Sequence, residues 1–279
     1  MAEENTEQKE FWEGFAAIWV ERQTDMDALF TPVLQGTLDR AVLTPGARVM
    51  DIGCGTGTST IEAARLVGPD GHALGVDISD PMLIRARELA RNVTNASFLT
   101  ADVADHPFED GGFDVVISRF GVMFFADPVK AFSNIRRALK PGGRLSMSCW
   151  SNLVANPWFS EAMYAAKSRL GTPPPVNLDD PGPLAFRDID RVTGILDAAG
   201  FQDIEGNAVP VMLTPPGNAA HAARLAASIG PAARTMEYFN GSEADFDAIA
   251  ADVAEAYASH ENNGRVTVPA EINFFTASA

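Results

Sequence analysis

Cysteine and histidine are scarce in this chain of 279 residues, which contains two cysteines and four histidines. Cys54 lies in a glycine-rich turn and Cys149 in an apolar strand pattern. We interpret both as free thiols in a reducing compartment. These few residues show no metal-ligand spacing, so the sequence predicts no metal site.

Basic residues are also few. The chain has 21 Lys and Arg against 37 Asp and Glu, which gives a net charge of −16. Such an anionic surface disfavours binding to phosphate backbones and to anionic lipid, so we expect no nucleic-acid partner.

Long apolar runs are missing too, which excludes a membrane-spanning helix of the usual length. The polar, acidic stretch of residues 1–10 lacks the basic and apolar blocks of a signal peptide. We therefore expect no membrane insertion and a cytoplasmic location.

The chain does contain a regular alternation of strand and helix patterns. Strands are predicted at residues 48–52, 72–76, 97–101, 113–118, 144–150, 201–209 and 265–276. Helices are predicted at 33–43, 58–66, 128–139, 156–170 and 190–199, from the Ser79-Asp80-Pro81 start onward, and two or three times within 215–262. Before them, an aromatic helical stripe runs from Phe11 through Trp19 to Pro32. The alternation predicts a parallel sheet with right-handed crossovers.

The first predicted strand ends on Asp51 and runs into a turn with Gly53, Gly55 and Gly57. Glycine lets backbone approach a ligand without a Cβ in the way, and the helix that follows offers unpaired N–H groups. The spacing G-x-G-x-G differs from the G-x-G-x-x-G of nicotinamide and flavin binders. It argues against an NAD-dependent dehydrogenase.

Two further strands also end on acids. Asp77 follows the second strand, 77 − 57 = 20 positions after the last glycine, and Asp102 follows the third. An acid at the end of the second strand is where nucleotide-binding α/β folds grip a ribose diol. The sequence therefore predicts three carboxylates along one edge of the sheet.

These features resemble the class I S-adenosylmethionine-dependent methyltransferases, most of all the small-molecule branch with the ubiquinone/menaquinone biosynthesis enzymes. The resemblance rests on five segments in order, at residues 49–57, 75–79, 101–103, 113–118 and 139–143. It implies a Rossmann-like α/β fold with a seven-stranded, mostly parallel sheet whose last strand is antiparallel, between the fifth and sixth.

The resemblance also implies a division of the chain. Residues 1–44 would cover the cofactor pocket, and 45–151 would form the cofactor-binding core. Residues 152–187 and 211–263 would be insertions forming a helical lid, with 188–210 and 264–279 completing the core.

The implied cofactor is S-adenosyl-L-methionine, with S-adenosyl-L-homocysteine as product. Asp51 would anchor the amino group of the methionine portion, Asp77 the ribose hydroxyls, and Asp102 the adenine amine. Arg119 would lie beside the methionine tail and pair with a carboxylate of either cofactor or acceptor. The full set of implied cofactor-binding residues is Asp51, Gly53, Cys54, Gly55, Gly57, Thr58, Asp77, Ile78, Met82, Asp102, Val103, Ser118 and Arg119.

The acceptor side is predicted to be apolar and enclosed, for a small, largely apolar or aromatic molecule. Candidate pocket residues are Trp19, Phe120, Met123, Phe124, Trp150, Trp158 and Tyr164. For the residues around Phe120, packing in the core is an equally good interpretation. No catalytic base is assigned, because proximity alone can supply about 7–11 kcal/mol of the barrier.

Two alternatives stay open beside methyl transfer. Relatives of this fold use the same cofactor for isomerisation, cyclisation or elimination, and a non-catalytic cofactor-binding subunit is the other class. The acceptor, the methylated atom and the oligomeric state, including a homodimer, are left open.

Overall fold

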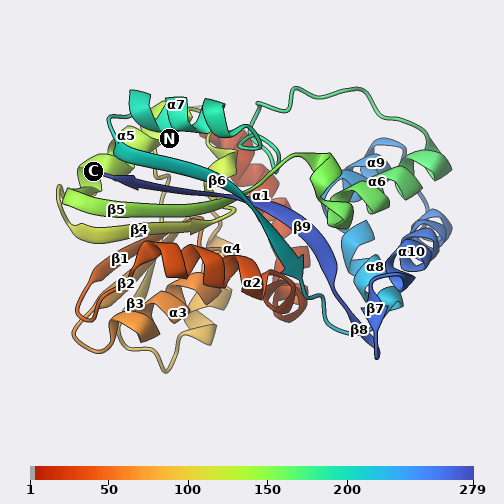
Figure 1. Cartoon of the computed structure of the whole chain (residues 1–279), viewed down its shortest axis with the longest axis horizontal. Helices are drawn as coiled ribbons and strands as arrows, with labels where there is room; N and C mark the ends of the chain where they lie inside the picture. Colours follow the sequence, from red (N-terminus) through yellow and green to blue (C-terminus); the bar gives the residue numbers. More distant parts are fainter. Residues whose placement is uncertain (1–3) are drawn as a thin grey trace.

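The computed structural model describes residues 4–279, with the side chains of Lys9 and of residues from Trp12 onward. The side chain of Phe11, in the predicted aromatic stripe, lies outside the described residues. One seven-stranded sheet organises the chain (Figure 1). Its strands, in spatial order, are β3 (Ala96–Thr100), β2 (His72–Asp77), β1 (Arg48–Ile52), β4 (Phe113–Arg119), β5 (Leu139–Trp150), β9 (Val268–Ser278) and β6 (Gln202–Leu213).

The first five strands along the chain pair in parallel, and β9 is antiparallel to both β5 and β6. This arrangement confirms the predicted fold class, including the place of the last strand. The strand β5 begins earlier than predicted, because Leu139 already pairs with Phe113 before the register shifts.

Helices cover both faces of the sheet. Figure 1 shows α5 (Pro128–Ala138) and α7 (Ile189–Ala198) on one side, and α2 (Gln23–Ala41) and α3 (Thr58–Val67) on the other. The helix α1 (Glu4–Glu21) packs against α4 (Asp80–Leu89) and α2. None of the helices in the described residues is long and apolar enough to cross a membrane.

The predicted end of a helix at Pro32 is wrong, because α2 continues through this proline. The helical segment is interrupted at Arg22 instead, between α1 and α2. Proline has no N–H to give to the carbonyl four residues earlier, so a proline inside a helix usually ends it. Here the freed carbonyl of Ala28 accepts a hydrogen bond of 3.0 Å from the Thr214 hydroxyl. A residue far along the chain thus supplies the donor that Pro32 lacks.

A helical lobe extends beyond the ends of β6 and β9 (Figure 1). It consists of α6 (Pro157–Leu170), α8 (Ala219–Ala227), α9 (Gly230–Tyr238) and α10 (Glu243–Ala258), which pack on one another. The helix α10 begins with a capping box between Ser242 and Asp245. A short hairpin, β7 (Glu261–Asn262) and β8 (Arg265–Val266), precedes β9 and was not predicted.

The centre of this lobe is a stacked aromatic pair. Trp158 of α6 and Tyr257 of α10 are fully buried, with ring centroids 5.9 Å apart. The Tyr257 hydroxyl donates a hydrogen bond of 3.1 Å to the Trp158 carbonyl oxygen. This bond joins α6 to α10, which lie about a hundred residues apart in the chain.

We expect Tyr257→Phe to lower the free energy of unfolding by about 1 kcal/mol, because the carbonyl of Trp158 would lose its buried donor. Urea denaturation followed by circular dichroism would measure it. The matched control is Tyr238→Phe, whose side chain is exposed and whose loss should leave stability unchanged. Equal stability of the two variants would contradict a stabilising role for the hydrogen bond between Tyr257 and Trp158.

Candidate functional site

The turn after β1 contains three glycines with positive φ angles: +63° at Gly53, +53° at Gly55 and +85° at Gly57. A Cβ on Gly53 would lie 2.5 Å from the Cα of Gly121, and one on Gly57 would lie 2.8 Å from the ring of Phe98. At Gly55 the nearest atom is the Met82 sulfur, at an ordinary 3.5 Å. Packing within the protein therefore requires glycine at two positions, and Gly55 is the one with room for a ligand.

We expect Gly53→Ala to lose about 2 kcal/mol more stability than Gly46→Ala, as measured by urea denaturation. Both glycines have positive φ angles, +63° and +83°, so both variants place an L side chain where φ is positive. Only Gly53 has backbone in the way, since nothing lies within 4 Å of a Cβ on Gly46. Equal losses of stability in the two variants would contradict this prediction, because they would show that the backbone around Gly53 can move to make room for the added methyl group.

Asp51, the last acid on β1, is completely buried. Its Oδ2 accepts hydrogen bonds of 2.6 Å from the hydroxyls of both Ser59 and Thr60, at the start of α3. Burial raises the pKa of Asp51 to about 6, against the lowering effect of these two donors and of the Arg119 guanidinium. Its second oxygen, Oδ1, is buried and has no partner. This orphaned acceptor points to a missing donor.

Asp77, at the end of β2, holds the glycine turn. Its Oδ2 accepts from the Gly55 N–H at 2.8 Å, and its Oδ1 accepts from the Ser79 N–H at 2.9 Å. Burial raises the pKa of Asp77, although these backbone donors oppose the shift. Each carboxylate oxygen can accept a second hydrogen bond, so capacity for a ligand's hydroxyls is left.

Strand register puts three charged side chains on one face. Asp51 pairs with Gly75 of β2 and with Ile117 of β4. Asp77 and Arg119 lie two residues beyond these partners, and side chains two apart share a face of a strand. The predicted cofactor residues Asp51, Asp77 and Arg119 are thus brought together past the sheet edge.

Arg119 is paired with an acid that the sequence did not single out. Its Nη2 lies 3.4 Å from Oδ1 of Asp27 on α2, and both side chains are largely buried. The Thr58 hydroxyl donates to the other oxygen of Asp27 at 2.7 Å. The Nη1 of Arg119 is buried without a partner.

Three further residues of the predicted cofactor set are apolar, one in the glycine turn and two after the end of β2. Cys54 and Met82 are buried, and Ile78 is half-buried beside them. Burial raises the pKa of the Cys54 thiol well above its usual range, so this cysteine stays protonated. These residues form the apolar surroundings of the turn.

Three other predicted residues make contacts within the chain. Oδ1 of Asp102 accepts from the Ala104 N–H at 2.9 Å, and the carbonyl of Val103 accepts from the Asn134 amide at 2.6 Å. The Ser118 hydroxyl donates to the Ile52 carbonyl at 2.8 Å and accepts from the Gly121 N–H at 3.2 Å. Ser118 therefore ties β1 to the turn after β4, a structural role that the sequence did not indicate.

Two of the predicted acceptor residues lie in an aromatic cluster. Phe120 stacks on Trp150 with centroids 4.8 Å apart and an interplanar angle of 4°. Phe30 of α2 packs edge-on against both rings, and Phe159 of α6 packs against Trp150 at 4.6 Å. Phe120 has a φ of +65°, a strained conformation for a bulky residue. Strain of this kind concentrates at functional sites.

A second aromatic group brings α1 over the segment after β4, where a short 3-10 helix, η1 (Val122–Phe124), follows the strand. Trp12 packs edge-on against Phe124 at 4.8 Å and against Trp19 at 6.1 Å. Trp19 and Phe124 are thus linked through Trp12, which the sequence analysis did not propose.

Three proposed acceptor residues lie elsewhere. Met123 is buried in the core. Trp158 is buried inside the lobe against Tyr257, and Tyr164 is exposed on α6. In this structure these three side chains pack in the core, pack within the lobe or face outward, and their place in the wall of a pocket stays a prediction.

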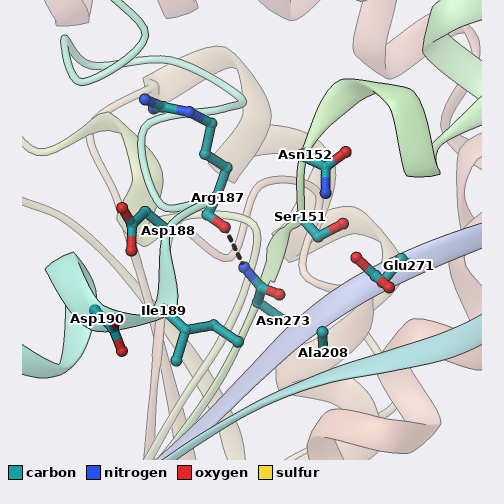
Figure 2. A pocket seen from close by; sticks show the side chains of 9 residues that line it. All are labelled: Ser151, Asn152, Arg187, Asp188, Ile189, Asp190, Ala208, Glu271 and Asn273. Atoms are coloured by element: carbon teal, nitrogen blue, oxygen red, sulfur yellow. Dashed lines mark hydrogen bonds between the residues drawn. The ribbon is translucent and has the colours of Figure 1, made fainter.

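The described residues line two cavities, of which the first lies away from the glycine turn and the second borders its end at Thr58. One, of about 340 Å³, lies among the end of β5, the start of α7 and the middle of β6 and β9 (Figure 2). The buried Asn273 donates to the Arg187 carbonyl there, while the Arg187 side chain points away. The other, of similar volume, lies between α2 and α3 and includes Asp27 and Thr58 in its wall.

Comparison with known proteins identifies the family. The family described as "Methyltransferase domain" matches residues 43–200, more than half of the chain. The chain belongs to this family. It therefore contains an S-adenosylmethionine-dependent methyltransferase domain, as its motifs predicted.

The ubiquinone/menaquinone biosynthesis C-methyltransferase of Pasteurella multocida is 40% identical over 124 residues, which are 43% of this chain and 46% of that protein. The match thus spans about half the length of this curated relative.

Two solved structures share the fold at low identity. A SAM-dependent methyltransferase from Aquifex aeolicus is 19% identical with a TM-score of 0.51, and the match covers 68% of this chain and 89% of that one. The [4+2]-cyclase SpnF is 20% identical with a TM-score of 0.52, over 88% of this chain and 80% of that one. At such identity these likenesses show the fold alone.

Proposed function

We propose that this protein transfers a methyl group from S-adenosylmethionine to a small, largely apolar or aromatic molecule. The observation that supports this most strongly is the pair of orphaned buried atoms beside the glycine turn, Oδ1 of Asp51 and Nη1 of Arg119. An acceptor on an acid and a donor on a base match the ammonium and carboxylate of a methionine portion.

The cofactor, when bound, supplies a methyl group on a positively charged sulfur, which makes the methyl carbon open to displacement. The chain then has to hold the donor and to exclude water. Asp51 would bind the amino group, Asp77 the ribose hydroxyls, and Gly55 would let the backbone come close. Ile78 and Met82 would pack on the adenine ring, next to Asp102.

The acceptor is proposed to bind near the cluster of Phe30, Phe120, Trp150 and Phe159, because these rings come together from α2, the end of β4, the end of β5 and the lobe. Aromatic walls favour apolar or aromatic molecules and keep water from the reacting atoms. The bound cofactor would supply the methyl group: an electron pair of the acceptor would form the bond to the methyl carbon as the sulfur–carbon bond breaks. The sulfur would keep the electrons of the broken bond, and a proton released by the acceptor would reach solvent when the product leaves.

Calorimetry with S-adenosylmethionine, S-adenosylhomocysteine and NAD tests the cofactor assignment. We expect both sulfur compounds to bind and NAD not to bind. Asp77→Asn should weaken S-adenosylhomocysteine binding about tenfold, because a charge-assisted hydrogen bond to ribose would be lost. The exposed Asp70→Asn, in the turn before β2, is the matched control. Binding of NAD alone would overturn the proposal.

The affinity for S-adenosylhomocysteine should also depend on pH through Asp51. Its pKa, raised to about 6, means that most of this carboxyl is protonated at pH 5.5 and ionised at pH 7.5. Only the ionised form attracts the ligand's ammonium group, so the affinity should rise about fourfold over this range. Calorimetry at both pH values measures the change. Asp51→Asn should bind weakly and without the rise, and an equal rise in this variant would refute the role of Asp51.

Cyclisation without methyl loss is the second candidate. Turnover with a candidate acceptor separates the two, because methyl transfer accumulates S-adenosylhomocysteine in equal amount with product and cyclisation leaves the cofactor intact.

A further inference from the structure

Asp27 occupies a junction between three parts of the structure. It belongs to α2, which covers one face of the sheet, and its two oxygens are used in different directions. Oδ2 accepts from the Thr58 hydroxyl at the end of the glycine turn, at 2.7 Å, and Oδ1 lies 3.4 Å from Nη2 of Arg119. One carboxylate thus joins the covering helix to both the turn and β4.

The position of Arg119 explains why this matters. Arg119 is paired across the sheet with Ser148, whose hydroxyl accepts a hydrogen bond of 2.9 Å from Thr37 of α2. Its side chain therefore leaves the sheet on the face that α2 covers. Asp51 lies on the same face, where burial raises its pKa and the Arg119 charge opposes part of that rise.

Without another acid, a buried guanidinium and a buried carboxylate on one face would pair with each other, because each offsets the other's desolvation. In this structure the Nη2 side of Arg119 faces Asp27 instead, and both Nη1 of Arg119 and Oδ1 of Asp51 stay unpartnered. Nη1 of Arg119 and Oδ1 of Asp51 are therefore kept apart, and each can bind a group of opposite charge on a ligand.

We propose that Asp27 is a positioning residue, which holds the Arg119 guanidinium by one edge so that Nη1 binds the carboxylate of the cofactor's amino-acid portion. Arg119 is then assigned to the cofactor and not to a carboxylate of the acceptor. This inference rests on the proposed function and adds to it a residue from the N-terminal cover. It also makes α2 part of the binding site, since Asp27 reaches Arg119 only when α2 lies on the sheet.

The test compares two ligands that differ only in the amino-acid portion. S-adenosylhomocysteine has the carboxylate and the ammonium group, and 5′-methylthioadenosine has the same nucleoside and thioether without them. In calorimetry on the full chain, Asp27→Asn should weaken S-adenosylhomocysteine about tenfold and change 5′-methylthioadenosine by less than twofold. Asp27→Glu keeps the charge and should recover part of the loss.

The matched control is Asp39→Asn, on the same helix. Asp39 is exposed and accepts from Gln35 four residues earlier, as Asp27 accepts from Gln23. It should change neither affinity. The double variant Asp27→Asn/Arg119→Gln should bind S-adenosylhomocysteine no more weakly than Arg119→Gln alone, because Asp27 acts through Arg119.

An equal weakening of both ligands by Asp27→Asn would overturn the inference and show that Asp27 only fixes the cover. The inference would also be overturned if the losses of S-adenosylhomocysteine affinity caused by Asp27→Asn and by Arg119→Gln added up fully in the double variant. If the unmodified protein binds neither ligand, the proposed function itself fails, which is a different result from a wild-type protein that binds both while Asp27→Asn behaves like wild type.

Discussion

A buried carboxylate at the end of β1 is the constraint on which the site depends. Burial outweighs the lowering effects of the Ser59 and Thr60 hydroxyls and of the Arg119 charge, and it raises the pKa of Asp51 from its ordinary 3.8 to about 6. Ionising Asp51 in the folded protein therefore costs about 3 kcal/mol more than in water, and it would cost more still without these three partners. The sharp glycine turn is what brings those hydroxyls back over the strand end. The first turn of α3 thus binds the carboxylate of Asp51 through these two hydroxyls.

The parts that followed from sequence are those set by local pattern. The five strand-and-helix alternations, the three acids and the glycine spacing each depend on residues close together in the chain. Parallel pairing then brings the strand ends to one edge, so the closeness of Asp51 and Asp77 could be predicted from the pattern of strands, whereas Arg119 was placed beside them by the family resemblance. The place of the last strand came from the family resemblance, and the register confirms it.

The parts that did not follow depend on partners far along the chain. Pro32 should end a helix, and only Thr214 explains why it does not. Asp27 is one of several acids along α2, and nothing in its neighbours distinguishes it from the exposed Asp39. The burial of Trp158 depends on α10, about a hundred residues later. Patterns within one helix cannot contain this information.

The way in which the lobe joins the sheet has an evolutionary consequence. Residues 214–267 leave after Leu213 and return before Val268, and these two residues are register partners on neighbouring strands. A segment whose ends meet at a paired position can lengthen, shorten or be replaced while every pairing in the sheet is kept. Lineages can therefore diversify this segment while the strand ends that carry Asp51, Asp77 and Arg119 stay unchanged.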